Sequence, residues 1–162
     1  MLLLLLTTPD ALRPAFRRFV ISCSTARQAR LCYEEAMKWA VTRRTFGKKL
    51  IGHQLIRFKL AEMVRQIESL QDMLERCAYQ FANGMPDRKM GGPCALLKVQ
   101  ASKTFEFCAR EASQIFGGSS VVREGRGAVV ERLYREVRAS AIPGGSEEIL
   151  LDFAMRQVAG KL

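Results

Sequence analysis

Residues 54–83, QLIRFKLAEMVRQIESLQDMLERCAYQFAN, carry the pattern that decides the fold of this chain. Apolar side chains recur along it every three or four residues, which is the period of one helix face. A stripe this regular over such a length predicts a long amphipathic helix. Its apolar members are Ile56, Leu60, Met63, Ile67, Leu70, Leu74, Cys77 and Phe81.

Helical periodicity continues upstream of this segment. A first helix is predicted to begin near Thr8 and Pro9, with threonine as its cap, and to end before Gly47. Pro14 is a point at which this helix could break. Its expected apolar face consists of Phe19, Cys23, Ala26, Tyr33, Met37 and Ala40.

Downstream, glycine and proline divide the chain into further helices. A loop is predicted from Gly84 to Pro93 because glycine and proline cluster there. A third helix is predicted over residues 94–116, where Gly117 and Gly118 end it. Its expected apolar face consists of Leu97, Ala101, Phe105, Cys108, Ala112 and Ile115.

Two shorter helices complete the predicted fold, one over residues 129–138 and one after Gly144 and Gly145 toward Ala159. Ser146 would cap the last helix, with two glutamates in its first turn near the positive end of the helix dipole. No strand is predicted. We expect an all-α fold, an antiparallel up-down-up-down four-helix bundle with a short extra helix, as one domain over residues 16–162.

Composition narrows the functional classes. The chain is 48% hydrophobic and 26% charged, as globular proteins are, and its net charge of +10 favours anionic partners. Its longest apolar run, residues 1–6, is too short to cross a membrane.

Five cysteines without a CxxC pair, beside one histidine, argue against a metal site and a disulfide framework. We therefore expect reduced cysteines in an intracellular protein.

Three segments are not explained by helix packing alone, and each places polar or basic groups beside glycine at a helix end. Glycine lets a ligand approach the backbone, and a helix N-terminus offers free N–H groups to an anion. Arginine adds a planar fork that suits phosphate oxygens. The pattern predicts a diphosphate or adenine-nucleotide site, with ordinary capped turns as the alternative. The segments are RRTFGKKLIGHQ (43–54), QIFGG (114–118) and ERLYREVRASAIPGGSEEIL (131–150).

In this order the segments resemble the C-terminal domain of the acyl-CoA dehydrogenases, over about residues 18–157. The closest match is to the branch of that family whose final turn reads GGS or GGT. The elements that carry the resemblance are RxxFG with its downstream glutamine (Arg43, Phe46, Gly47, Gln54), QxFGG (114–118), the ERxYR-like run (Glu131, Arg132, Tyr134, Arg135) and GGSEEI (144–149).

The resemblance implies FAD as cofactor and acyl-CoA as substrate, with α,β-dehydrogenation to a trans-2-enoyl-CoA. It implies a homo-oligomer, a dimer or tetramer formed through this bundle. Arg18 matches an arginine near the active site of the family. The residues that the resemblance assigns to FAD, several of them across a subunit interface, are Arg43, Phe46, Gln54, Gln114, Gly117, Gly118, Ser146 and Glu148.

The family's catalytic base has no counterpart in this chain. One branch places a glutamate at the position of Gly144, and the other places it directly before the conserved arginine, where this chain has Arg17. Arginine stays protonated and cannot accept a proton from the substrate. We expect the atypical residues 1–15 not to be authentic enzyme sequence, and a longer natural chain to carry glutamate before Arg18.

Two other functions remain open at this stage. The first is a non-catalytic helical protein of the family that binds FAD or a partner. The second is nucleic-acid binding, which the positive charge suggests. The sequence contains no recognisable nucleic-acid-binding motif, so we expect no nucleic acid as a partner. We expect no membrane partner either. His53 is expected to have a structural role. Family habit suggests the mitochondrion, with the peroxisome as the alternative.

Overall fold

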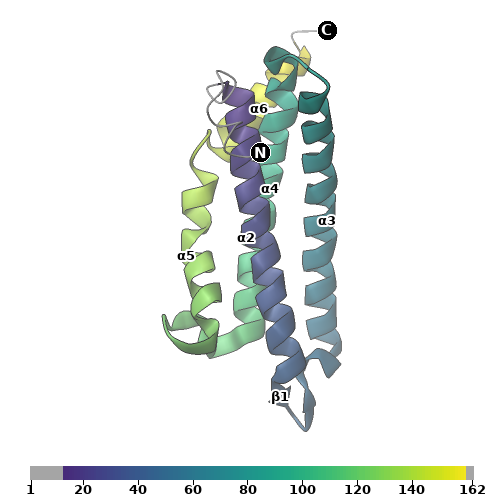
Figure 1. Cartoon of the computed structure of the whole chain (residues 1–162). Helices are drawn as coiled ribbons and strands as arrows, with labels where there is room; N and C mark the ends of the chain where they lie inside the picture. The colour runs from purple at the N-terminus through teal and green to yellow at the C-terminus, as the bar shows by residue number, and fades with distance from the viewer. Residues whose placement is uncertain (1–12, 160–162) are drawn as a thin grey trace.

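The computed structural model describes residues 13–159. Four helices run alternately up and down as a bundle, and a fifth lies along the first half of α4 (Figure 1). This confirms the predicted all-α bundle; the predicted helix start at Thr8 and Pro9 lies outside the described residues. The helices are α2 (Pro14–Thr42), α3 (Gln54–Ala82), α4 (Asp87–Phe116), α5 (Ala128–Ala141) and α6 (Glu147–Ala159).

Helix α3 forms where the stripe predicted it. Six of its eight apolar positions are buried, and the outer two, Ile56 and Phe81, are half-buried. Helix α4 lies at the centre, in contact with α2, α3, α5 and α6. All six positions of its predicted apolar face are buried, which confirms that prediction.

The buried face of α2 differs from the predicted one. The predicted face chose the larger apolar residues, but Phe19, Ala26, Tyr33 and Met37 are half-buried and Cys23 is exposed. Small side chains form the inner face instead because they let α2 approach α4 closely. That face consists of Ala15, Ser22, Thr25, Ala29, Cys32, Ala36 and Ala40. Pro14 does not interrupt α2; it is the first residue of the helix, where its missing N–H has no partner to lose.

Helix α4 begins seven residues earlier than predicted. Gly91, Gly92 and Pro93 lie inside it, so the loop after α3 is limited to residues 83–86. The glycines allow α6 to pack on α4. A Cβ atom on Gly91 would lie 3.3 Å from the ring of Phe153, and one on Gly92 would lie 3.7 Å from Gln157.

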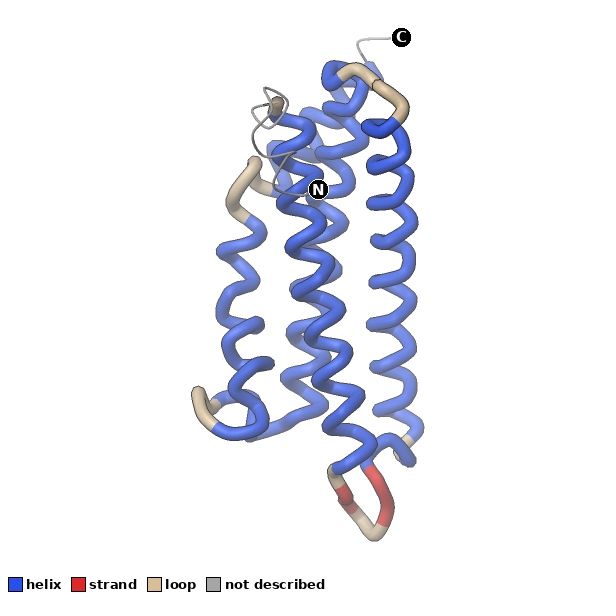
Figure 2. Tube along the Cα trace, in the orientation of Figure 1, coloured by secondary structure: helices blue, strands red, loops and turns tan. Residues whose placement is uncertain are grey.

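A short β-hairpin between α2 and α3, with strands of two residues each, was not predicted. Strands β1 (Arg44–Thr45) and β2 (Lys48–Lys49) pair antiparallel and project from the end of the bundle (Figure 2). The two turn residues, Phe46 and Gly47, both have positive φ angles, 49° and 77°, as a type I′ turn requires. Strands this short show no alternating pattern. The remaining short elements are the 3₁₀ helices η2 (Leu50–Gly52), η3 (Gly117–Val121) and η4 (Gly125–Gly127).

Candidate functional site

An aromatic stack joins the first two predicted site segments at the hairpin end of the bundle. Trp39, near the end of α2, stacks on Phe116, the last residue of α4, with ring centroids 5.0 Å apart. Trp39 also contacts Arg43, whose guanidinium lies 5.8 Å from the centroid of the Trp39 ring. The structure therefore brings RRTFGKKLIGHQ and QIFGG together.

The hairpin displays its tip to solvent. Phe46 is 97% exposed, with its ring edge-on to His53 at 6.2 Å. A hydrogen bond of 3.0 Å joins Thr45 Oγ1 to His53 Nε2, and His53 directly precedes Gln54, the first residue of α3. His53 thus anchors the hairpin, which agrees with the structural role expected for it.

The QIFGG segment presents open backbone beside the hairpin. Gln114 is exposed, and Gly117 ends α4 with a φ of 63°, in the region that glycine favours. A Cβ atom on Gly118 would meet nothing within 4 Å. A shallow groove of ≈ 280 Å³ lies next to the Trp39–Phe116 stack and is lined by Glu35, Lys38, Trp39, Thr42, Phe116 and Arg126.

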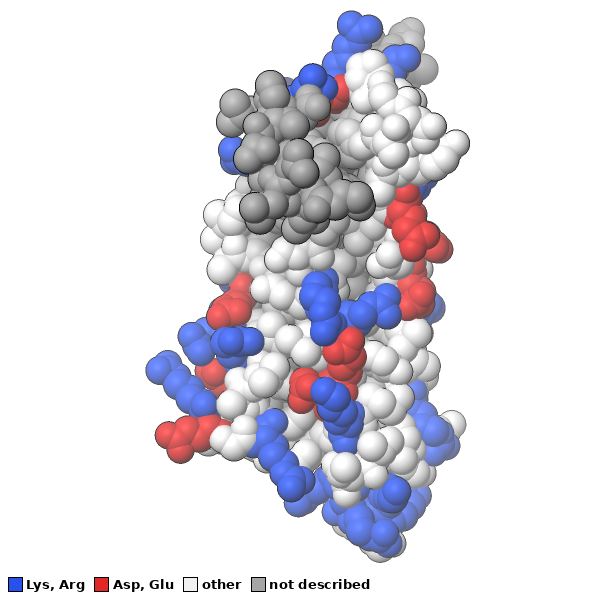
Figure 3. All heavy atoms as spheres, in the orientation of Figure 1, with Lys and Arg blue, Asp and Glu red and all other residues white. Residues whose placement is uncertain are grey.

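These residues fit contacts to the phosphates and adenine of a nucleotide cofactor. Arg43, Gln54 and Gln114 offer exposed donors, and the backbone at Gly118 is open to close approach. Figure 3 shows lysine and arginine side chains gathered on the hairpin end of the viewed face.

Only the last part of the third segment, residues 144–150, lies at the opposite end of the bundle. Its first part, from Glu131, belongs to α5, which begins beside η3 at the end of α4. Arg18, in the first turns of α2, donates a 3.1 Å hydrogen bond from Nε to the carbonyl of Gly144. Its guanidinium also lies 5.1 Å from the ring centroid of Phe153 in α6. Arg18 and Trp39 lie on one helix, and 21 residues of α-helix separate them by roughly 30 Å. The turn at Gly144 therefore does not meet the hairpin segment or QIFGG within one chain.

Both positions that could hold the catalytic base lie at the Arg18 end. Arg17 is exposed on α2 beside Arg18, and Gly144 accepts the Arg18 hydrogen bond. Gly144 has a φ of 80°, and a Cβ atom there would lie 3.0 Å from Cδ1 of Ile21. Neither residue can accept a proton from a substrate.

Two glutamates begin α6, as predicted. A hydrogen bond from its own backbone N–H, helped by the Ser146 hydroxyl, holds the pKa of Glu148 below its ordinary value. Burial alone would raise the pKa of Glu147, but Ser102 at 2.7 Å and Lys103 at 3.2 Å stabilise its carboxylate, and the net effect lowers that pKa. Ser146 accepts the first helical hydrogen bond, from the backbone N–H of Leu150, which places it at the N-cap.

Lys98 belongs to this end of the bundle, and the sequence interpretation missed it. It is 1% exposed, and its Nζ donates to the carbonyl oxygens of Ala141 and Gly145. Burial lowers the pKa of its ammonium. A signal did exist, because Lys98 lies in register with Ala101 and Phe105 on the buried face of α4.

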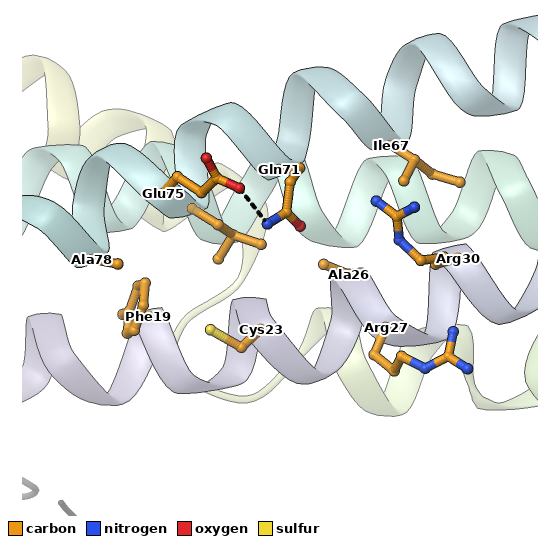
Figure 4. Close-up of a pocket in the computed structure, with 10 residues that line it drawn as sticks. Phe19, Cys23, Ala26, Arg27, Arg30, Ile67, Gln71, Glu75 and Ala78 are labelled. Atoms are coloured by element: carbon orange, nitrogen blue, oxygen red, sulfur yellow. Dashed lines mark hydrogen bonds between the residues drawn. The ribbon is translucent and has the colours of Figure 1, made fainter. Parts of the chain in front are cut away.

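A second groove, of ≈ 330 Å³, runs between α2 and α3 away from these sites (Figure 4). Phe19, Cys23 and Leu74 line it, and Gln71 donates to Glu75 at its rim. No predicted site residue lies in this groove. Within residues 13–159, no helix is long and apolar enough to span a bilayer, and no cluster of potential metal ligands occurs.

Comparisons with known proteins identify the family of this chain. Residues 14–159 match the family model described as acyl-CoA dehydrogenase, C-terminal domain. Acyl-CoA dehydrogenase AFT10-1 of Alternaria alternata is 46% identical over 142 residues, which cover 85% of this chain and 33% of that protein. Acyl-CoA dehydrogenase apdG of Emericella nidulans is 34% identical over 87% of this chain and 33% of that protein.

Solved structures show the same fold. A probable acyl-CoA dehydrogenase of Mycobacterium abscessus superposes with a TM-score of 0.83 at 30% identity, covering 90% of this chain and 37% of that one. Butyryl-CoA dehydrogenase of Megasphaera elsdenii gives a TM-score of 0.81 at 27% identity, covering 90% and 37%. The chain thus spans about a third of the length of the relatives it matches. It belongs to the acyl-CoA dehydrogenase family and corresponds to the C-terminal domain of that family.

Proposed function

We propose that this chain supplies the C-terminal helical domain of an FAD-dependent acyl-CoA dehydrogenase, which converts acyl-CoA thioesters to trans-2-enoyl-CoA products in fatty-acid β-oxidation. One observation carries the proposal. The nucleotide-contact segments and the Arg18 turn lie roughly 30 Å apart at opposite ends of α2. Because these two groups of residues do not meet within residues 13–159, we expect a complete site to require further protein and the chain to be inactive alone.

A homo-oligomer would complete both ends at once. In a two-fold dimer or tetramer, the hairpin of one chain can reach the cofactor held by its partner, while Arg18 serves its own chain. Arg43, Phe46 and Gln54 would hold the adenosine diphosphate half of FAD from the neighbouring chain, and Gln114, Gly117 and Gly118 would make a second set of contacts to FAD from that chain. Ser146 and Glu148 would contact it from the chain that binds the substrate.

When bound, FAD supplies the hydride acceptor for this chemistry. The chain's own residues would bind and orient. Arg18, exposed donors at the hairpin and the turn at Gly144 would place cofactor and acyl-CoA, and a carboxylate must remove the proton next to the thioester carbonyl.

The turn geometry favours position 17 over position 144 for that carboxylate. A side chain at 144 would have to adopt a φ of 80°, which costs about 1–3 kcal/mol for a residue other than glycine. Position 17 is an exposed position of α2 next to Arg18, where a glutamate side chain needs no such backbone conformation. This supports the GGS branch of the family. With Arg17 in place, the domain lacks a base.

A chimera tests the proposal. Residues 14–159 of this chain would replace the matching third of AFT10-1, and the chimera would be compared with its Arg17→Glu and Gly144→Glu variants. We expect all three to retain FAD and to form dimers or tetramers in light scattering. Only Arg17→Glu should lose its flavin absorbance when acyl-CoA is added without oxygen.

Each other result has a definite meaning. Loss of FAD from all three proteins would refute the cofactor assignment. Flavin reduction by the chimera with Arg17 intact would show that another group is the base. FAD retained without reduction in the Arg17→Glu variant would favour the alternative function, a non-catalytic FAD- or partner-binding member of the family.

A further inference from the structure

We propose that Lys98 is a positioning residue that acts with Arg18 to hold the Gly144–Ser146 turn in its working shape. The observation is a pair of hydrogen bonds. Arg18 from α2 holds the carbonyl of Gly144, and Lys98 from α4 holds the carbonyl of Gly145. Two cationic side chains from two different helices therefore donate hydrogen bonds to consecutive carbonyl oxygens of one turn.

The burial of Lys98 indicates a specific role. Lysine is almost never fully buried without a partner, because removing an ammonium from water is costly. Lys98 has no carboxylate within its hydrogen bonds; its partners are the carbonyls of Ala141 and Gly145. The charged groups that face it are Glu147, which stabilises the ammonium, and Arg138, which opposes it.

The two carbonyls explain why a cation is needed there. Ala141 ends α5, and the last carbonyls of a helix have no partner within the helix and carry its negative dipole end. Gly145 lies beyond that end with a φ of 120°, and a Cβ atom on it would lie 2.9 Å from Leu150. The Lys98 ammonium satisfies both oxygens and fixes the distance between the end of α5 and the turn.

A turn with unusual backbone angles is stable only when several surrounding contacts hold it in place. Gly144 and Gly145 both adopt backbone angles that few other residues accept, and strain of this kind is stored at sites where geometry matters. Ser146 follows the turn directly and begins α6. A shift of the turn therefore moves Ser146 and Glu148, the proposed cofactor contacts.

The catalytic meaning of Lys98 rests on the proposed function, but its grip on the turn can be measured without it. In the 162-residue chain, amide hydrogen exchange would be followed by NMR at Leu150, whose N–H donates to Ser146, and at Ile142, whose N–H donates to Arg138. Lys98→Met removes the ammonium and keeps an unbranched side chain. We expect exchange at these two amides to accelerate about tenfold or more.

Lys59→Met is the matched control. Lys59 pairs with buried Glu111 toward the hairpin end, so this variant also loses a buried cation contact but leaves the turn intact. In Lys59→Met, hydrogen exchange at Leu150 and Ile142 should accelerate no more than exchange at the slowest amides of the core does. Equal acceleration in both variants, or none in Lys98→Met, would refute the positioning role.

The unaltered chain gives an independent test if Lys98→Met fails to fold. The Lys98 ammonium protons should be visible by NMR, should exchange slowly and should show cross-relaxation with the α protons of Gly145. A solvent-averaged ammonium signal at Lys98 would overturn the proposal.

A kinetic measurement tests the catalytic part. In the Arg17→Glu chimera, Lys98→Met should lower kcat by about a hundredfold with a smaller change in KM, because the displaced turn misplaces reacting groups rather than weakening CoA binding. The Lys59→Met chimera should keep its kcat at a temperature where both are folded. An unchanged kcat in Lys98→Met, with accelerated exchange at the turn, would refute the catalytic meaning while leaving the structural grip in place.

Discussion

Trp39 and Phe116 lie nearly parallel, with 10° between their ring planes and 5.0 Å between their centroids. The contact fastens the end of α2, which leads into the hairpin, to the end of α4, which leads into QIFGG. It therefore fixes the relative position of the two segments that we assign to the cofactor. Trp39 is the chain's single tryptophan, so the tryptophan fluorescence of the chain comes from this site alone.

Phe116→Leu should disturb this contact measurably. The variant loses an aromatic pair and part of a buried side chain, so unfolding free energy should fall by about 1–3 kcal/mol and the Trp39 emission should shift. Urea unfolding followed by fluorescence measures both. Phe58→Leu is the control, since Phe58 is 63% exposed on α3, and it should change neither quantity appreciably. An unshifted emission in Phe116→Leu would contradict the stack.

Replacement by alanine should affect stability very differently at two glycines near this end. A Cβ atom on Gly127 would lie 1.8 Å from the backbone oxygen of Ser119, so Gly127→Ala should destabilise the chain by about 2–4 kcal/mol. A Cβ atom on Gly118 meets nothing, so Gly118→Ala should stay within about 0.5 kcal/mol of the unaltered chain. Thermal unfolding by circular dichroism compares the two.

Gly118→Ala has a second expected outcome. In the chimera it should weaken FAD retention, because the added methyl group occupies backbone surface that we assign to the cofactor. Flavin-to-protein absorbance after gel filtration measures this. Full retention in a stable Gly118→Ala chimera would remove Gly118 from the proposed site.

The helical part of the fold was predictable because it depends on repeated local patterns. The stripe in residues 54–83 and the face of residues 94–116 recur many times per helix, so single exceptions do not hide them. The start of α4 was misplaced because Gly91, Gly92 and Pro93 usually end helices. Here a long-range contact decides, since the glycines make room for Phe153 and Gln157.

The site was predictable in its parts and not in its assembly. Motif resemblance identified Arg18 and Gly144 separately, and only the fold shows that they bond across 126 residues of sequence. Buried charges were missed for another reason. Lys98 and Glu111 lie on the inner face of α4, and a charged residue on a helix is normally exposed.

The pair formed by Lys59 and Glu111 should contribute to stability. Glu111 is 5% exposed and also contacts Arg110 at 2.8 Å. Lys59→Met leaves this carboxylate with one weaker, more exposed partner, so unfolding free energy should fall by about 2–4 kcal/mol. Replacing both residues, Lys59→Met with Glu111→Leu, should recover much of that loss because no buried carboxylate remains at this position. Urea unfolding of the two variants decides, and a double variant that is no more stable than the single one would contradict the argument.

Glu147 should make the stability of the chain depend on pH in acid. Its hydrogen bonds from Ser102 and Lys103 lower its pKa below the ordinary value of 4.5. A carboxyl with a lowered folded-state pKa stabilises the fold above its unfolded pKa, and this contribution disappears as the pH falls through the folded pKa. Ser102→Ala removes one of these hydrogen bonds. It should therefore melt at a lower temperature than the unaltered chain above about pH 5, and the difference should narrow below pH 4.5.

Ser113→Ala provides the control for this pH dependence. Ser113 lies on the same helix and bonds to Ser120 at 2.8 Å, with no carboxylate involved. Its melting difference from the unaltered chain should stay constant over the same pH range. If the Ser102→Ala difference is also constant, Ser102 does not stabilise the Glu147 carboxylate. A narrowing confined to Ser102→Ala would show that the first turn of α6 is held by an ionised Glu147, directly beside the turn that Lys98 and Arg18 grip.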